Sequence, residues 1–221
     1  MSDLFDTAGP SDETPGEPPR PETHDALLRA AAECRRCPLW EDTTQVVVSD
    51  GTPTADLMFV GEQPGDKEDL AGKPFVGPAG QLFDIALSRV GIERQTAYVT
   101  NAVKHFKHFK RGSRRIHEKP GVAEIDACRW WLDAERRIVR PKLIVALGAS
   151  GARGVTKRQV TISRERGVVR ALDDGPEHVM ITIHPSALLR IPDDQPAKKR
   201  TEWYAFLGDL ETARDWLAKA G

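Results

Sequence analysis

The chain has 221 residues, of which 39% are hydrophobic and 29% charged, so it can form one globular domain with a sizeable core. No stretch has the apolar length of a membrane span, and residues 1 to 6 are acidic and lack the regions of a secretory signal. We therefore expect a cytoplasmic protein whose three cysteines are reduced. Residues 1 to 25 carry seven acidic side chains and one arginine, which leaves the rest of the chain basic although the net charge is −1. That balance permits nucleic-acid binding without establishing it.

Residues 1 to 22 contain five prolines among acidic and small side chains. They offer too little apolar surface to offset the entropy of ordering, so we expect a disordered acidic tail. The folded domain is then expected over residues 23 to 221. It opens with a predicted helix from residue 24 to 33, followed at once by Cys34 and Cys37.

Four short apolar runs have the composition of buried strands, and segments with helical spacing separate most of them. Continuous apolar strands alternating with helices predict an α/β fold, with a four-stranded parallel sheet covered on both faces. The predicted strands are 57–60, 97–103, 143–147 and 179–183, the clearest predicted helices are 122–138 and 198–219, and 160–172 is expected to be an irregular hairpin.

Polar residues follow each predicted strand. Ligands of parallel sheets bind outside the carboxyl ends of the strands, so these residues are expected to converge on one edge. The first group continues as an acidic, glycine-rich stretch through residue 80, which in isolation is equally well a solvated loop. The four groups are Gly61–Gly65, Asn101–Lys104, Gly148–Ser150 and His184–Ser186.

Residues 104 to 119 form the most basic stretch, with seven cations against Glu118 and with Phe106 and Phe109 between them. Cations neutralise phosphates and aromatic faces stack on bases, so this composition predicts a groove for single-stranded nucleic acid. A solvated basic loop is the alternative interpretation.

Cys34 and Cys37 have the spacing of metal ligands, and Cys128 is the third thiol. A fourth ligand has to come from another residue type, and either His105 or His108 can supply it. These histidines are three residues apart, so on an extended backbone only one of them faces the metal. From spacing alone zinc ranks ahead of an iron-sulfur cluster, and unpaired buried cysteines are the alternative.

Taken together, these motifs resemble the family 4 branch of uracil-DNA glycosylases. Within it, Lys104-His-Phe-Lys107 and Arg114-Arg-Ile-His117 are similar to the UdgX subfamily, although Ser113 stands where that loop usually has lysine. The resemblance covers about residues 25 to 215. The remaining motifs that carry it are Gly61-Glu-Gln-Pro-Gly65, Pro74-Phe-Val-Gly-Pro-Ala-Gly80, Thr100-Asn-Ala-Val-Lys104, Cys34-x-x-Cys37, Cys128 and His184-Pro-Ser186.

The resemblance implies a three-layer α/β/α uracil-DNA glycosylase fold and a 4Fe-4S cluster. It moves the expected metal from zinc to iron-sulfur, with Cys34, Cys37, His105 and Cys128 as ligands and His108 left open as the alternative. It also implies recognition of uracil in DNA. In the subfamily the loop histidine attacks the deoxyribose and stays joined to the abasic site, and His117 matches that histidine.

Chemical roles follow for the residues at the sheet edge. Asn101 can pair with uracil N3–H and O4, Phe75 can stack on the base, and His184 can stabilise charge on uracil O2. Glu62 can stabilise the cationic sugar, and Gln63 can position water in a hydrolytic alternative. Further predicted pocket residues are Gly61, Gly65, Asp66 and Ser186, and predicted DNA contacts are Lys104, Lys107, Arg114, Arg115 and Arg190.

Three other functions compete with a covalent glycosylase. One is a conventional hydrolytic glycosylase with multiple turnovers, and another is a non-enzymatic iron-sulfur module that binds single strands. The third is a phosphate-ester hydrolase that uses the acidic loop with magnesium. The expected partner is uracil-containing DNA, single-stranded first and duplex second, bound by a monomer.

Overall fold

The computed structural model describes residues 21–220, and its centre is a six-stranded sheet in the order β1-β3-β2-β6-β8-β7. The four inner strands are mutually parallel and are the four that the sequence predicts. The α/β fold class is therefore confirmed, whereas the predicted count of four strands is wrong. The strands are β1 (Ser49–Gly51), β2 (Leu57–Gly61), β3 (Tyr98–Asn101), β6 (Leu143–Leu147), β7 (Val169–Ala171) and β8 (His178–Thr182).

The two additional strands lie at the edges of the sheet and pair antiparallel with their neighbours. Each has three residues and a partly exposed pattern, so neither carries the apolar run that reveals a buried strand. β7 falls in residues 160–172, where we expected an irregular hairpin; a short helix, α6 (Ile162–Glu165), precedes it. Apart from Pro21 and Glu22, the predicted tail lies outside the described residues.

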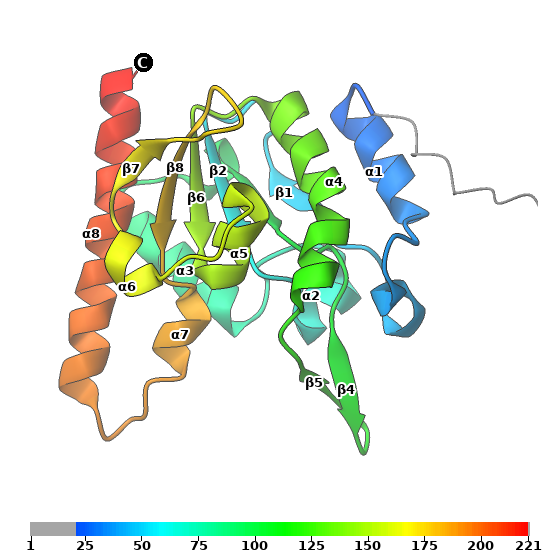
Figure 1. Ribbon diagram of the computed structural model, residues 1–221. Coiled ribbons are helices and arrows are strands. Elements are labelled where there is room, and N and C mark those ends of the chain that lie inside the picture. The colour runs from blue at the N-terminus through cyan, green and yellow to red at the C-terminus, as the bar shows by residue number, and fades with distance from the viewer. Residues whose placement is uncertain (1–20, 221) are drawn as a thin grey trace, which may run out of the picture.

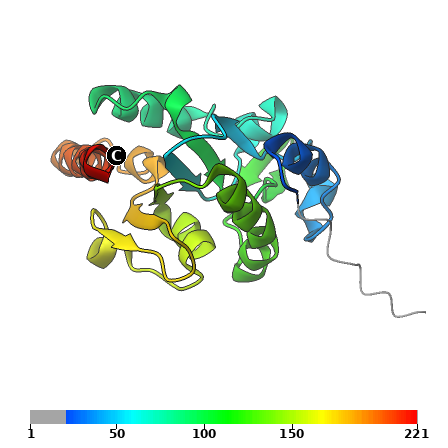
Figure 2. The same cartoon turned by 90° about the horizontal axis from the view of Figure 1, so that it is seen from above.

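Helices cover both faces of the sheet, which gives three layers (Figures 1 and 2). Leu57 and Phe59 of β2 pack in one apolar cluster with Phe83 and Phe206, whereas Met58 and Val60 pack in the other. Both sides of β2 are thus buried, as its continuous apolar run predicts. The helices are α1 (His24–Ala32), α2 (Asp66–Ala71), α3 (Pro78–Arg89), α4 (Val122–Val139), α5 (Gly148–Thr156), α7 (Pro185–Leu189) and α8 (Pro196–Ala220), with 3₁₀ turns η1 (Pro38–Asp42) and η2 (Arg94–Thr96).

The basic stretch forms a separate two-stranded antiparallel hairpin of β4 (His108–Arg111) and β5 (Arg114–His117). Figure 1 shows this hairpin extending from the body at the edge where β6 and β8 end. Gly112 takes a left-handed conformation at the turn, with φ of 61°. Within residues 21–220, no helix has the length and apolar composition needed to cross a bilayer.

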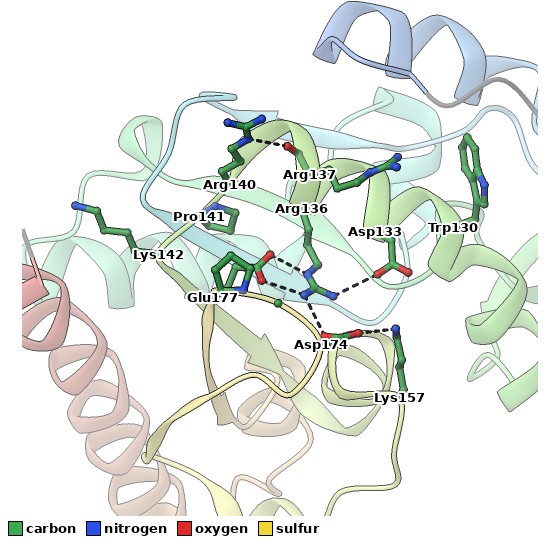
Figure 3. Close-up of a pocket in the computed structure, with 12 residues that line it drawn as sticks. Trp130, Asp133, Arg136, Arg137, Arg140, Pro141, Lys142, Lys157, Asp174 and Glu177 are labelled. Carbon is green, nitrogen blue, oxygen red and sulfur yellow. Dashed lines mark hydrogen bonds and ion pairs between the residues drawn. The ribbon is translucent and has the colours of Figure 1, made fainter.

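A buried ion pair lies at the opposite end of the parallel strands, where β6 and β8 begin (Figure 3). Arg136 on α4 binds Glu177 in bidentate fashion at 3.2 and 3.1 Å, and both residues are 6% exposed. Asp133 and Asp174 complete the contacts of this guanidinium. A cavity of about 820 Å³ surrounds the pair and contains none of the predicted site residues.

We predict that Arg136→Met destabilises the protein by about 3–5 kcal/mol, because it leaves the Glu177 carboxylate buried without a partner. The double variant Arg136→Met/Glu177→Gln should recover most of that loss, since it buries no unpaired charge. Urea unfolding followed by circular dichroism measures both. Equal stability of the single and double variants would contradict this explanation.

Candidate active site

A second cavity, of about 610 Å³, lies at the carboxyl edge of the sheet, where the sequence predicts the site. Its walls come from the residues after β2 and β8, from the last residues of β3 and β5, and from α2 through the start of α3. Parallel pairing places Gly61 opposite Asn101, so these residues meet without any special loop. The predicted site residues that line the cavity are Glu62, Gln63, Gly65, Asp66, Phe75, Asn101, His117, His184, Ser186 and Arg190.

Gly61 packs beneath two residues that line the cavity, where a side chain would clash with both. A Cβ atom there would lie 2.3 Å from Asn101 Oδ1 and 2.7 Å from the Phe75 ring. Only glycine lets the amide and the ring approach the strand end this closely. Asn101 is 2% exposed and Phe75 5%, so both present their groups from a packed wall.

Phe75 has a left-handed backbone, with φ of 58°, which is uncommon for a residue with a bulky side chain. Gly80 on α3 accommodates it, because a Cβ at Gly80 would lie 1.8 Å from the Phe75 carbonyl oxygen. The ring packs against Phe83, with centroids 5.2 Å apart, and lies 5.7 Å from the ring of His184. Strain of this kind persists where the surroundings fix it, and here it places an aromatic face in the cavity.

His184 has a defined tautomer. The Ser186 backbone N–H donates to its Nδ1 at 3.2 Å, and the Ser186 hydroxyl lies 2.8 Å from the same atom. Arg190 donates to that hydroxyl at 2.9 Å. Burial, with the charges of Arg190 and His117, lowers the pKa of His184 to about 4. The ring is therefore neutral at pH 7 with its proton on Nε2, so it is a hydrogen-bond donor.

Glu62 lies between two further side chains. Its Oε2 accepts a hydrogen bond from the Ser150 hydroxyl at 2.5 Å, and its Oε1 lies 3.5 Å from His117 Nε2. Ser150, 2% exposed in the first turn of α5, was not among the predicted site residues. Its place in Gly148–Ser150, after the third predicted strand, was the signal that pointed to it.

Gln63 joins the cavity to the base of the hairpin. Its side-chain amide donates to the Lys107 and Glu118 carbonyls at 3.1 and 3.0 Å, and its Oε1 accepts from the Lys107 N–H at 3.1 Å. Both ends of the amide are thus engaged by the backbone. The predicted role of positioning water does not fit this arrangement, whereas a role in anchoring the hairpin does.

Lys104 is not a surface DNA contact, and that prediction is wrong. Its side chain is fully buried, and its Nζ lies 2.5 Å from Glu135 Oε2, which is also fully buried. An ammonium group with no exposed surface cannot reach a phosphate. The sequence signal failed because the partner, on α4, is 31 residues away.

Lys107 and Arg115 face the body of the protein. Lys107 pairs with Glu124 at 3.0 Å and Glu118 at 3.5 Å. Arg115 pairs with Asp66 at 2.6 Å and with the buried Asp69 at 2.5 Å, and its guanidinium lies over the Phe106 ring. These pairs hold the hairpin against α2 and the start of α4. The exposed cations of the basic stretch are Lys110, Arg111, Arg114 and Lys119, and Arg190 after α7 is also exposed.

Cys34, after α1, and Cys128, on α4, belong to one buried cluster, Cys37 is partly exposed, and all three are free thiols. Trp131 donates from its indole nitrogen to Cys34 Sγ at 3.0 Å, and the Lys104 N–H donates to Cys128 Sγ at 3.2 Å. Burial raises the pKa of Cys128 to about 12, and the nearby Cys34 and Cys37 contribute to the increase. Within residues 21–220, no three His, Cys, Asp or Glu side chains stand close enough to hold one metal ion.

The two candidate histidine ligands differ in their surroundings. His105 is 4% exposed, and its buried Nδ1 has no hydrogen-bond partner in the described chain. His108 lies on β4, where its Nδ1 is 3.0 Å from the Phe106 carbonyl oxygen and its ring stacks on Phe106. An unpartnered buried nitrogen is costly, and ligation would satisfy it. The geometry favours His105 over His108.

Comparisons with known proteins point in one direction. The model of the uracil DNA glycosylase superfamily matches residues 48–208. The chain is 35% identical over 204 residues to the type-4 uracil-DNA glycosylase of Thermotoga maritima, which covers 91% of this chain and 98% of the relative. It is 35% identical over 167 residues to the type-4 uracil-DNA glycosylase of Sulfurisphaera tokodaii, a match that covers 72% of this chain and 73% of the relative. The Archaeoglobus fulgidus enzyme is 33% identical over 177 residues, covering 77% and 85%.

The low pKa of His184 predicts a dependence of stability on pH. In the unfolded chain its pKa is about 6.5, and in the folded protein it is about 4. Protons therefore bind the unfolded chain preferentially, so the free energy of unfolding decreases as the pH falls from about 6.5 to about 4. We expect His184→Gln to make this decrease shallower in urea unfolding across that range. An unchanged slope would show that His184 is not held neutral by folding.

Proposed function

The chain belongs to the uracil DNA glycosylase superfamily, and from that premise we propose that it excises uracil from DNA and becomes covalently joined through His117 to the abasic site. The observation that carries the proposal is the approach of His117 Nε2 to within 3.5 Å of Glu62 Oε1, at the mouth of the cavity. A carboxylate beside an imidazole can both stabilise a cationic sugar and raise the nucleophilicity of the ring.

Recognition begins with extrusion of the base into the cavity. The Asn101 amide accepts from uracil N3–H and donates to O4, whereas cytosine mismatches both bonds. The wrong base would leave buried polar groups unpaired, which gives strong discrimination. Phe75 stacks on the base from the wall that its strained backbone defines.

Bond cleavage uses the neutral His184. As the bond between uracil N1 and C1′ breaks, its electron pair moves into the ring, and the Nε2–H of His184 donates to O2, where charge develops. Glu62, fixed by Ser150, lies on the side of His117 and stabilises the oxocarbenium ion. An imidazole nitrogen of His117 then bonds to C1′, the alkylated ring loses its remaining N–H proton, and the uracil anion takes up a proton.

The nucleophile can be tested by replacing His117 with serine. We expect His117→Ser to abolish the heat-stable protein–DNA adduct, because no imidazole then captures C1′. It should still release uracil and leave a free abasic site, since Glu62, Asn101 and His184 remain. A denaturing gel with a uracil-containing oligonucleotide scores the adduct, and alkali cleavage scores the abasic site.

Glu62→Gln is the matched variant, because it should slow both adduct formation and uracil release. A heat-stable crosslink retained by His117→Ser would place the nucleophile elsewhere. Multiple turnovers by the wild type, without an adduct, would favour a conventional hydrolytic glycosylase. Binding without release of any base would favour a non-enzymatic module.

We assign DNA binding to the hairpin tip and to Arg190, which follows α7 and is exposed. Lys110, Arg111 and Arg114 are exposed at the tip, and Phe109 on β4 is 49% exposed beside them. Cations next to an exposed aromatic ring suit a single strand, whose bases are available for stacking. We therefore assign single-stranded uracil-containing DNA as the preferred substrate.

We also assign a 4Fe-4S cluster to Cys34, Cys37, Cys128 and His105. Thiolates are the usual ligands of such clusters, and the unpartnered His105 nitrogen supplies a fourth. A four-iron cluster separates its ligands more than a single ion does, which is compatible with the absence of a single-ion site in residues 21–220. When bound, the cluster cross-links the segment after α1 to α4 and to the residues that follow β3.

The cluster assignment predicts a brown protein with broad absorbance in the visible range. We expect His105→Ala to lose this absorbance and to bind less iron, because the substitution removes the buried nitrogen assigned as the fourth ligand. His108→Ala, in the repeated Lys-His-Phe, is the matched control and should keep the colour. Iron analysis and visible spectroscopy decide, and a colourless protein with stoichiometric zinc would refute the cluster.

A further inference from the structure

Lys104 and Glu135 form an ion pair in which both side chains have no exposed surface. The Glu135 carboxylate is held by two further groups, since the Tyr98 hydroxyl donates to Oε1 at 3.1 Å and the Thr100 hydroxyl lies 2.8 Å from it. Removing two charges from water is costly unless each is paired and hydrogen-bonded. The Lys104–Glu135 pair meets this condition, and it lies between β3, which carries Tyr98 and Thr100, and α4, which carries Glu135.

The position of Lys104 connects this pair to two other places. Its Nζ donates at 2.8 Å to the backbone carbonyl oxygen of Asn101, the residue whose side chain lines the cavity. Its own backbone N–H donates to Cys128 Sγ. His105 is the next residue along the chain. One lysine thus touches the residue assigned to base reading and adjoins the cysteine site.

We propose that Lys104 is a positioning residue for base recognition, which fixes the end of β3 so that the Asn101 amide meets the uracil edge. The inference rests on the proposed function. The peptide between Asn101 and Ala102 is held from two sides, because its N–H donates to the Gly61 carbonyl at 3.0 Å and its oxygen accepts from Lys104 Nζ. A shift of this peptide would displace the Asn101 Cα that carries the side chain. Because Glu135 holds the ammonium from α4, the reading amide is fixed against a rigid helix and not against a loop.

The competing explanation is that the pair only stabilises the fold. The Arg136–Glu177 pair provides the comparison, because it is also buried and Arg136 is also on α4, but it lies at the opposite end of the parallel strands (Figure 3). A neutral substitution of either pair removes two buried charges. Only the pair that touches Asn101 should affect the chemistry of the base.

The experiment compares Lys104→Met/Glu135→Gln with Arg136→Met/Glu177→Gln. The glutamine oxygen can still accept from Tyr98, so the first variant leaves no buried unpaired charge. Uracil release from a single-stranded oligonucleotide is measured under single-turnover conditions, as the rate at saturating protein and as the half-saturating concentration. Urea unfolding reports the stability of each variant.

We expect Lys104→Met/Glu135→Gln to lower the saturating rate about tenfold or more, as displacement of one buried hydrogen bond predicts. The half-saturating concentration should stay the same, because the exposed cations at the hairpin tip are untouched. Arg136→Met/Glu177→Gln should leave both values at the wild-type level. A Lys104 variant that is folded and retains the wild-type rate would overturn the proposal.

A second variant covers failure to fold. Lys104→Gln/Glu135→Gln buries no charge and keeps a donor at residue 104 that is one bond shorter than lysine, and the same split between rate and half-saturation decides. Failure of the proposed function looks different, since the wild type itself would then release no uracil. A higher half-saturating concentration with an unchanged saturating rate would also refute the positioning role, because it would indicate that Lys104 contributes to DNA binding.

Discussion

The parallel register of β2, β3, β6 and β8 is the constraint on which the site depends. It aligns four carboxyl ends, so Gly61 lies opposite Asn101 and the residues after β6 and β8 reach the same edge. A helix begins directly after β6, at Gly148, and another begins at Pro185, with two residues between it and the end of β8. Their first turns contain Ser150 and Ser186, which orient Glu62 and His184 respectively. The strands thus fix where the side chains of the candidate site stand, and the helix starts fix their orientation.

Much of this architecture could be predicted from the sequence because its signals are local. Apolar runs such as Leu143–Leu147 indicate buried strands, and polar groups directly after them indicate a shared edge. The edge strands gave no such signal, since three residues with mixed exposure resemble a loop. Ser150 was visible only as part of a strand end, because its role depends on contact with Glu62, 88 residues away.

Charge was the least predictable property of the chain. Seven cations in residues 104–119 suggested a uniformly solvated, DNA-facing surface. Three of them instead pair with carboxylates from distant elements: Lys104 with Glu135, Lys107 with Glu124, and Arg115 with Asp69. A local run specifies charge, but only the partners determine whether that charge is exposed. The same run therefore supplies both the internal anchors of the hairpin and its exposed tip.

The ion pairs that hold the hairpin affect whether the His117 imidazole or water reacts with the sugar cation in the proposed mechanism. His117 is 48% exposed in its side chain, so water reaches the same region. Three contacts, through Gln63, Lys107 and Arg115, hold the hairpin that carries His117 against the body. A group held in reacting geometry reaches an effective concentration of roughly 10⁵ M or more, which exceeds that of liquid water. In the proposed mechanism a well-anchored histidine therefore captures the sugar before water does, and loosening the hairpin would shift the outcome toward hydrolysis without altering how the base is recognised.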